Sequence, residues 1–341
     1  MFKLIDRLFK NHDLEDSELK TLLTSFTPEV AEYAAKKARE LTENIFGKGI
    51  FIRGLIEFGN FCKNDCYYCG IRRSNRIERY RLSQDEILAA CENGYNLGFR
   101  TFVLQSGEDG FFTDDIMCAI IRKIKENYPD CALTLSIGER SFEDYLKFKD
   151  AGADRFLLRH ETATKSHYEL LHPHDMSFEN RLSCLKALKD LGYQVGCGIM
   201  VGSPYQDDDC IVRDLRFMKD FKPHMIGIGP FIPSSGTPFA NKEAGSVSKT
   251  LFLLSILRLM HPQVLLPATT ALGSLEGDGI KNGLLCGANV VMPNLTPMSQ
   301  RSKYTIYDNK QSNDLENLKN ILNDLGLHIE VSRGDSPLIN I

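Results

Sequence analysis

From residue 50 onward, short apolar runs alternate with longer amphipathic segments along the chain. Short apolar runs are typical of buried strands, and apolar positions three or four residues apart indicate helices. We expect strands near residues 51–58, 101–105, 132–137, 154–158, 195–201, 225–229, 264–269 and 288–292. We expect helices at residues 83–98, 114–127, 142–151, 177–192, 207–220, 246–260 and 276–285.

This alternation predicts an α/β fold with a parallel sheet. Eight strands, each followed by a helix or a loop, in about 240 residues predict one (β/α)8 TIM barrel, with an open doubly wound sheet as the alternative. Residues 13–45 carry apolar positions at helical spacing ahead of the first strand. We therefore predict an N-terminal helical extension at 1–48, a barrel at 49–310 and a C-terminal extension at 311–341 that packs on the barrel.

Composition and charge narrow the class of function. The chain has 341 residues, 43% of them hydrophobic, and a formal net charge of −4 at pH 7. No long block of Lys and Arg stands out, which argues against a nucleic-acid partner. The N-terminal segment MFKLIDRLFKNHDLEDSELK lacks the apolar core of a signal peptide, and no apolar run reaches the roughly 18 residues of a membrane span. We expect a cytoplasmic protein that acts on a small molecule, without a membrane partner.

Three of the ten cysteines lie close together in the loop after the first predicted strand. Cys62, Cys66 and Cys69 are separated by three and by two residues, so their thiolates can converge on one 4Fe-4S cluster. Three ligands leave one iron open, and the amino and carboxylate groups of S-adenosylmethionine (SAM) could chelate it. A zinc site is the alternative, but residues 55–61 and 70–80 offer no fourth Cys or His.

The other cysteines are not paired at the spacing of metal ligands. They fall within the predicted helices and strands, and the absence of an export signal indicates reduced thiols. We expect them to pack in the core: Cys91, Cys118, Cys131, Cys184, Cys197, Cys210 and Cys286.

The cysteine spacing, the aromatic Tyr68 before the third cysteine and the predicted barrel together resemble the radical SAM superfamily. The segments IEFGNFCKNDCYYCGIRRSN, FVLQSGED, AGADRFLLRHET, SFENRLSCLKALKDLGY and PATTALG further resemble the HydE maturases of iron-iron hydrogenase. This resemblance implies an enzyme that cleaves SAM to a 5′-deoxyadenosyl species. That species would act on an organometallic Fe(CO)2CN-cysteine precursor of the two-iron unit. The resemblance also implies HydG and HydF as partner maturases, and an electron donor.

The same resemblance implies which residues hold the cofactors. Cys62, Cys66 and Cys69 would bind the cluster, and the contacts to SAM would come from Tyr68, Gln105, Ser106, Gly107, Glu108, Glu161 and Arg181. In this family the segment Ser106-Gly107-Glu108 would hold the methionyl amino group. Glu161 would contact the ribose, and Arg181 would bind the methionyl carboxylate, which suits a bidentate guanidinium.

A second set of residues matches positions that line or approach the internal cavity of HydE. The set is Thr134, Arg155, Arg159, Met225, Thr269, Thr270, Met292 and Tyr304. Arginines and hydroxyls suit an anionic iron-cyanide substrate. Without the resemblance, the two arginines could equally form salt bridges at the barrel end, and the two methionines could be core residues.

The sequence is also compatible with other functions. Some HydE proteins bind an auxiliary cluster through three cysteines after the barrel, and YTIYDNKQSNDLENL has none, so we expect one cluster. A lysine mutase that resembles methylornithine synthase shares the cysteine loop, although Arg159-His160-Glu161-Thr162 and PATTA favour HydE. Biotin synthase fits less well, because the ligands of its sulfur-donating cluster have no evident counterpart. An iron-sulfur scaffold or carrier would need an exposed, exchangeable cluster, whereas a barrel mouth would enclose it.

Overall fold

The computed structural model describes residues 1–310 and 315–340, and six parallel strands form most of a barrel wall. They hydrogen-bond in the order β2 (Gly54–Gly59), β3 (Thr101–Ser106), β4 (Ala132–Ser136), β5 (Arg155–Leu157), β6 (Gln194–Cys197) and β8 (Met225–Ile226). Two short strands, β7 (Met200–Val201) and β9 (Gly229–Pro230), pair in parallel with each other. They follow β6 and β8 in the chain and continue these two strands of the wall. Most of these residues are buried, as expected for a parallel sheet that is covered on both faces.

The sheet closes on itself rather than ending in two open edges. β1 (Gly49–Ile52), which is separated from β2 only by Arg53, pairs in parallel with β10 (Val290–Val291). Isolated bridges complete the ring: Met225 to Leu265, Pro267 to Val290, and Leu55 to Asn294. The predicted barrel is confirmed over the open doubly wound sheet. The strand expected at 264–269 exists only as these bridges, and Pro267 there has no N–H to donate to a ladder.

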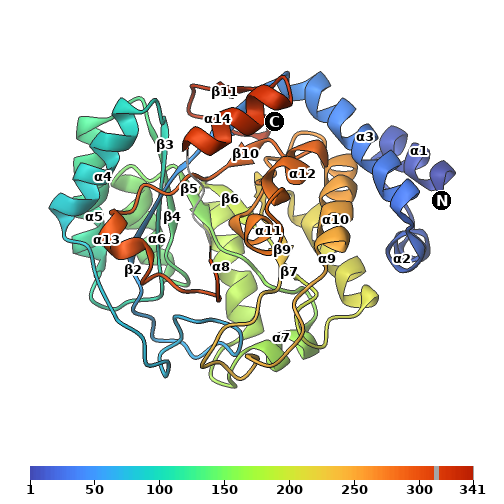
Figure 1. Cartoon of the computed structure of the whole chain (residues 1–341). Coiled ribbons are helices and arrows are strands. Elements are labelled where there is room, and N and C mark those ends of the chain that lie inside the picture. The colour runs from blue at the N-terminus through green and yellow to red at the C-terminus, as the bar shows by residue number, and fades with distance from the viewer. Residues whose placement is uncertain (311–314, 341) are drawn as a thin grey trace.

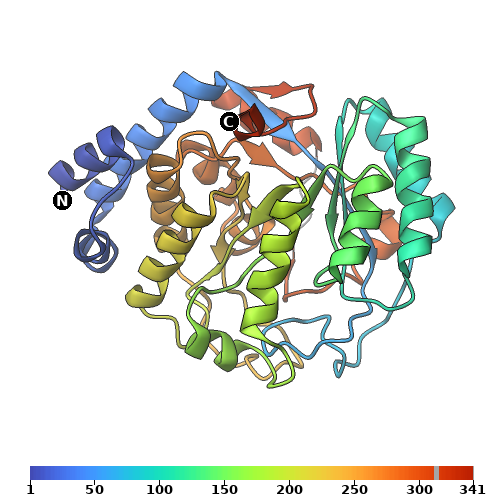
Figure 2. The ribbon, with the colours of Figure 1, turned by 180° about the vertical axis from the view of Figure 1, so that it is seen from behind.

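Helices cover the outside of the barrel (Figures 1 and 2). The predicted ones are α4 (Gln84–Asn96), α5 (Asp114–Asn127), α6 (Phe142–Asp150), α8 (Phe178–Asp190), α9 (Asp208–Phe221), α10 (Val247–Met260) and α12 (Gly279–Leu285). Most begin at a side chain that accepts a backbone N–H, as at Ser83, Thr113, Ser141, Ser177, Asp207 and Ser246. The short helices α7 (Lys165–Leu171), α11 (Thr270–Leu275) and α13 (Met298–Arg301) were not predicted, because so few residues give little periodicity.

The C-terminal segment lies at the N-terminal end of the strands, opposite the cysteine loop, whereas the N-terminal helices extend to one side of the barrel (Figure 1). α1 (Phe2–Asn11), α2 (Asp16–Ser25) and α3 (Pro28–Phe46) lie on the side of α10, where Phe26 stacks on Phe252 with ring centroids 4.5 Å apart. Beyond the barrel, α14 (Leu315–Asp324) leads to β11 (His328–Glu330), which pairs in parallel with β1, and to a 3-10 turn η1 (Pro337–Asn340). No helix in the described ranges is long and apolar enough to cross a membrane.

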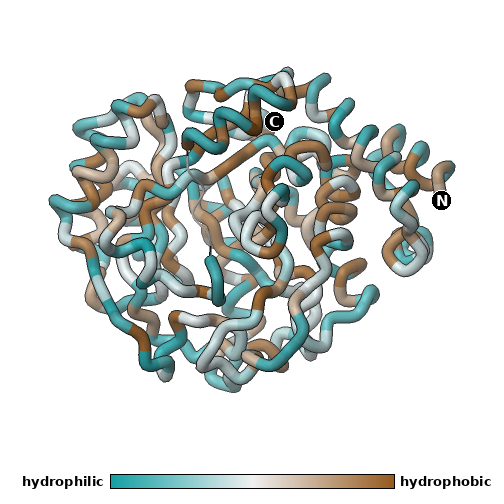
Figure 3. Tube along the Cα trace, in the orientation of Figure 1, coloured by the Kyte–Doolittle hydropathy of each residue, from teal (hydrophilic) through white to brown (hydrophobic). Residues whose placement is uncertain are grey.

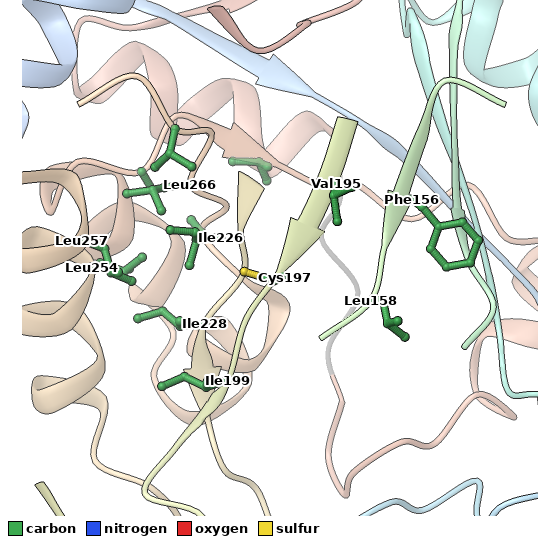
Figure 4. Close-up of a cluster of buried hydrophobic side chains, with 14 of the residues drawn as sticks. Phe156, Leu158, Val195, Cys197, Ile199, Ile226, Ile228, Leu254, Leu257 and Leu266 are labelled. Carbon is green, nitrogen blue, oxygen red and sulfur yellow. The ribbon is translucent and has the colours of Figure 1, made fainter. Parts of the chain in front are cut away.

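Apolar side chains fill the layer between the strands and their helices. Figure 3 shows hydrophobic segments concentrated on the inner elements. In the close-up of Figure 4, Cys197 lies among Val195, Ile199 and Ile226, with Leu254 of α10 packed beyond them. Cys197 and the six other cysteines outside the loop are all buried, so the expectation that they pack in the core is confirmed.

One fully buried arginine ties α10 to the last part of the barrel. Arg258 Nε donates to Gly287 O at 3.0 Å, and Nη1 donates to Pro262 O at 2.8 Å and Val264 O at 2.7 Å. Nη2 donates to Asn289 Oδ1 at 3.0 Å. Burial lowers the pKa of Arg258 to about 9. The hydrogen bonds offset the cost of burying the guanidinium, and they hold the segments that lack a regular strand.

We predict that Arg258→Gln lowers the free energy of unfolding by more than about 3 kcal/mol, because several buried carbonyl groups lose their donors together. Arg122→Gln, an exposed arginine on α5, is the matched control and should change it by less than about 0.5 kcal/mol. Urea denaturation followed by circular dichroism measures both. Equal stabilities of the two variants would contradict the assigned role.

Candidate active site

The cysteine loop, residues 60–81, leaves the end of β2 and lies against neighbouring backbone. At the end of β3, a Cβ on Gly107 would stand 2.6 Å from the Cβ of Cys62, so only glycine permits this approach. At the other end of the cysteine run, a Cβ on Gly70 would overlap the carbonyl of Thr305. The loop is therefore clamped between the β3 end and the segment that follows α13.

Arg79 organises this loop from within. Its Nη1 donates to Asn60 O at 2.5 Å and Ile71 O at 2.8 Å. Its Nη2 donates to Arg72 O at 2.6 Å and Asn75 O at 3.0 Å. These carbonyls belong to residues on both sides of the cysteines, so one side chain fixes the shape of the whole loop. Arg79 was not a predicted site residue, although several other basic residues lie in the same loop.

The three cysteines line one cavity and are partly exposed, unlike the other seven. Burial raises the pKa of all three thiols, to about 12 for Cys69. No group of three His, Cys, Asp or Glu within the described residues is arranged to hold one metal ion. Each cysteine of a cubic cluster binds a different iron, so a cluster does not require such a single-ion arrangement. The donor set, three soft thiolates supplied by one loop, fits an iron-sulfur cluster.

Tyr68, between the second and third cysteines, is held by a neutral histidine. His172 Nδ1 lies 2.9 Å from the carbonyl of Tyr168, so this nitrogen carries the proton, and Nε2 can accept from Tyr68 Oη at 3.2 Å. Burial lowers the pKa of His172 to about 3, which keeps the ring neutral. The ring of Tyr168 stacks on His172 with centroids 3.9 Å apart. His172 was not a predicted site residue.

Glu108, after the end of β3, is anchored on the same side of the cavity. Its Oε1 accepts from Glu139 N at 3.0 Å, and its Oε2 lies 3.2 Å from Lys63 Nζ. The carboxylate packs against Gly138, where a Cβ would clash with it. Ser106, Gly107 and Glu108 thus border the cavity beside Cys62, as the resemblance implies.

Arg181, from α8, reaches the cavity wall but is already engaged. Its Nε donates to Glu139 Oε1 at 2.5 Å, and its Nη1 donates to Arg159 O at 2.8 Å. A carboxylate ligand could bind the remaining Nη2 side, whereas a grip that uses Nε would have to displace Glu139. Glu139, in the loop after β4, is a third residue that was not predicted from the sequence.

Arg159 and Glu161 face each other at the end of β5. Arg159 Nη2 lies 3.0 Å from Glu161 Oε2. Neither atom has a hydrogen bond of good geometry within the described structure, and Arg159 Nε also has none. Glu161 has a φ of 64°, a strained conformation for a side chain other than glycine. Buried polar atoms without partners, beside a cavity, indicate that a bound molecule completes their hydrogen bonding.

The cavity has a volume of about 360 Å³ and extends from the barrel mouth into its interior. This size is within the range of small-molecule sites. The predicted site residues that line it are Cys62, Cys66, Tyr68, Cys69, Gln105, Ser106, Gly107, Glu108, Arg159, Glu161, Arg181, Met225, Thr269, Thr270, Met292 and Tyr304. The structure therefore brings together both the expected cofactor residues and most of the expected substrate residues.

Thr134 and Arg155 do not line this cavity. They border a smaller pocket toward the N-terminal ends of the strands, which also includes Met225. Arg155 Nη2 donates to Asp335 Oδ1 at 2.6 Å and to Arg333 O at 2.5 Å. The sequence alone allowed either a substrate contact or a salt bridge for Arg155, and the structure shows the salt bridge. The reason is that Arg155 is the first residue of β5, whereas the cavity is lined by the last residue of the strand and by residues beyond it.

A buried ion pair forms another part of the cavity wall. Glu57 of β2 binds Lys310, and its Oε2 accepts from Asn294 Nδ2 at 3.0 Å. Lys310 also lies over the ring of Tyr304, 4.7 Å from its centroid, and Tyr304 Oη accepts from Gln105 Nε2 at 3.2 Å. Neither Glu57 nor Lys310 was a predicted site residue, because partners so distant in sequence leave no local pattern.

Comparison with known proteins agrees with this geometry. Residues 56–218 match the family model of the radical SAM superfamily. The solved structure of methylornithine synthase (PylB) superposes with a TM-score of 0.86 at 29% identity, covering 96% of this chain and 97% of that one. The barrel and its cysteine loop are thus those of a radical SAM enzyme, a class that uses a 4Fe-4S cluster and SAM.

Two curated relatives narrow the position within that class. The [FeFe] hydrogenase maturase subunit HydE of Thermotoga maritima is 46% identical over 276 residues, which cover 81% of this chain and 78% of the relative. The 3-methylornithine synthase of Methanosarcina acetivorans is 30% identical over 323 residues, 94% of this chain and 91% of the relative. The chain belongs to the HydE-like radical SAM proteins.

We predict that Arg79→Gln loses most of the iron that the wild-type protein retains after reconstitution. Each hydrogen bond from a charged donor contributes about 1.5–3 kcal/mol, and the substitution removes most of the set. Iron content and visible absorbance after gel filtration measure the loss. Arg76→Gln, an exposed arginine of the same loop, should keep its iron, and a similar loss there would refute a specific role for Arg79.

Proposed function

We propose that this protein is a maturase of iron-iron hydrogenase that carries one 4Fe-4S cluster and uses SAM on an organometallic Fe(CO)2CN-cysteine precursor. One observation carries the proposal: a single cavity is bordered by the three cysteines and, further around the barrel, by Arg159, Thr269 and Thr270. A cofactor and a small anionic substrate would share this enclosed space. The identity to HydE supports the same function.

Different residues of the cavity would hold the cluster and the parts of SAM. Cys62, Cys66 and Cys69 would hold the cluster, which when bound supplies the electron that cleaves SAM. Glu108 would bind the methionyl amino group of SAM through its carboxylate oxygens. Arg181 would bind the methionyl carboxylate of SAM through the Nη2 side of its guanidinium. Glu161 would accept hydrogen bonds from the ribose hydroxyls.

Arg159 would supply the positive charge on the substrate side of the cavity. Arg159 has guanidinium nitrogens without hydrogen-bond partners in the described structure, and Thr269 and Thr270, which carry hydroxyl groups, line the same cavity. An anionic iron-cyanide group would accept charge-assisted hydrogen bonds from Arg159. Met225 and Met292 would give an apolar floor that keeps water from the reacting carbon and iron atoms.

The proposed partners are HydG, as the source of the substrate, HydF, as the acceptor of the product, and an electron donor. We propose that they meet in the cytoplasm. The direct test is anaerobic spectroscopy of the reconstituted protein with the HydG product and SAM. Consumption of that iron species is expected. Its persistence, while SAM is cleaved, would overturn the proposed substrate.

A second candidate is a lysine mutase like methylornithine synthase. The similarity in fold to methylornithine synthase extends over 96% of this chain and 97% of that one, and this observation favours the mutase function. Incubation with lysine, SAM and reductant distinguishes the two. Formation of a rearranged amino acid would favour the mutase, and its absence alongside consumption of the iron species would favour the maturase.

We predict that Cys66→Ala abolishes formation of the SAM-binding cluster, because no nearby residue can replace its thiolate. The 4Fe-4S signal in electron paramagnetic resonance and the yield of 5′-deoxyadenosine measure the effect. Cys184→Ala removes a buried thiol of α8 and is the control, which should retain the cluster. A full cluster signal with SAM cleavage in Cys66→Ala would refute the ligand assignment.

We predict that Arg159→Leu lowers turnover of the iron substrate about 10- to 100-fold, because a charge-assisted contact contributes about 1.5–3 kcal/mol. Background cleavage of SAM should fall much less. Both rates are measured on one reconstituted sample of known iron content, with Arg122→Leu on α5 as the control. Unchanged substrate turnover would assign Arg159 a structural role, and a parallel collapse of both rates would assign it to SAM.

A further inference from the structure

The cysteine loop is much more basic than the rest of the chain. Residues 60–81 contain six Lys or Arg and two Asp or Glu, a net charge of +4, whereas the whole chain carries −4 at pH 7. The six are Lys63, Arg72, Arg73, Arg76, Arg79 and Arg81. Other residues separate them, so they form no long basic block in the sequence. The folded loop nevertheless brings this charge to the segment that holds the cysteines.

Two of the six cations are used inside the structure. Arg79 binds the backbone carbonyls of its own loop. Arg81 makes two hydrogen bonds to Asp109, at 2.6 and 3.0 Å, and its guanidinium lies 3.7 Å from the ring centroid of Phe61. These two arginines are therefore not available to a partner.

The outward charge comes mainly from Arg73 and Arg76. The side chain of Arg73 is 64% exposed although it pairs with Asp65. Arg76 is exposed and has no ion-pair partner in the described parts of the chain. Lys63 is equally open, at 65% exposed, and lies beside Glu108. The face around the cysteines thus presents more positive than negative charge.

The acidic residues of the loop do not cancel this excess. Asp65 lies 3.2 Å from Arg72 and 3.1 Å from Arg73, so it faces two cations. Glu78 lies 2.5 Å from Lys303, which follows α13. The neighbouring turn 172–177 adds Asp175, and the segment after α13 adds Asp308, which accepts from Ser235 N at 3.0 Å. These acidic groups are fewer than the six cations of the loop, and Asp65 and Glu78 are already in ion pairs.

This basic surface is directly attached to the cysteine run. The backbone N–H of Arg72 donates to Cys69 O at 3.1 Å, and that of Arg73 donates to Asn64 O at 2.8 Å. The loop forms an outer edge of the molecule, far from α1 and α3 (Figures 1 and 2). A protein that approached this edge would come close to the cluster without entering the cavity where SAM and substrate would bind.

We propose that the outer face of the cysteine loop, centred on Arg73 and Arg76, docks an acidic one-electron carrier protein that reduces the cluster. The proposal rests on the cofactor set under the proposed function, but not on the identity of the substrate. The carrier is oxidised by one electron and the cluster is reduced by the same electron, so no bond forms or breaks in this step. Complementary charge would speed the encounter and orient the two proteins.

The test compares two reductants on the reconstituted holoprotein in a stopped-flow instrument. Reduced flavodoxin, an acidic flavoprotein, needs to dock, whereas photoreduced 5-deazariboflavin is small and uncharged. The variant is Arg73→Glu/Arg76→Glu. The control is Lys3→Glu/Lys36→Glu, which reverses two exposed charges on α1 and α3 at the opposite end of the molecule.

We expect the variant to be reduced by flavodoxin about 10-fold or more slowly than wild type at low salt, with the difference vanishing toward 1 M salt, where the Debye length is about 3 Å. Its affinity for oxidised flavodoxin, measured by calorimetry, should fall in parallel. Iron content and the rate with deazariboflavin should match wild type, and the control should match wild type throughout. The neutral variant Arg73→Gln/Arg76→Gln should be reduced by flavodoxin at a rate between those of wild type and the charge-reversed variant. It shows whether the slower reduction arises from misfolding caused by the reversed charges.

Unchanged reduction by flavodoxin would overturn the docking site, and so would equal slowing with both reductants, since the arginines would then act on the cluster itself. Failure of the proposed function would look different. A protein that is reduced normally and cleaves SAM, but leaves the iron species intact, would defeat the proposed substrate and leave the docking result standing.

Discussion

The hydrogen bonds from Arg79 to four backbone carbonyls are the constraint on which the site depends. Three cysteines in one loop can share a cluster only if the loop has a fixed shape, and residues 60–81 have almost no strand or helix ladder to supply it. A planar guanidinium with several donors can satisfy several carbonyls at once. Gly107 and Gly70 then allow neighbouring backbone to clamp the loop at the barrel mouth.

Charges around the cavity are mostly paired before any ligand arrives. Arg181 binds Glu139, and Glu57 binds Lys310. Such buried pairs pay much of their desolvation cost through mutual attraction, so they hold the wall in one arrangement rather than add much stability. Arg159 and Glu161 differ, because they lie close together without good hydrogen bonds. The unsatisfied pair marks the part of the wall where binding energy remains available to a ligand.

The sequence was most informative where the pattern is local. Periodic apolar positions predicted the barrel and its main helices, and the spacing of Cys62, Cys66 and Cys69 predicted the loop that borders the cavity. The resemblance implied the same role for Arg155 and Arg159, which are four residues apart in the sequence. In the structure Arg155 is the first residue of β5, and Arg159 lies beyond its last residue. Arg79, Glu139 and Lys310 escaped notice because their partners are known only once the chain has folded.

The segment after α13 explains how the cavity wall can form without additional cysteines. Tyr304 reaches Gln105 of β3, the backbone N–H of Gly70 donates to Ile306 O at 2.9 Å, and Lys310 reaches Glu57 of β2. These contacts join the segment to two strands and to the cysteine loop through ordinary hydrogen bonds and one ion pair. Since they need no metal, the position of this wall does not depend on an auxiliary cluster. A sequence that lacks those cysteines can therefore keep the same enclosed space between the cysteine loop and the strand ends.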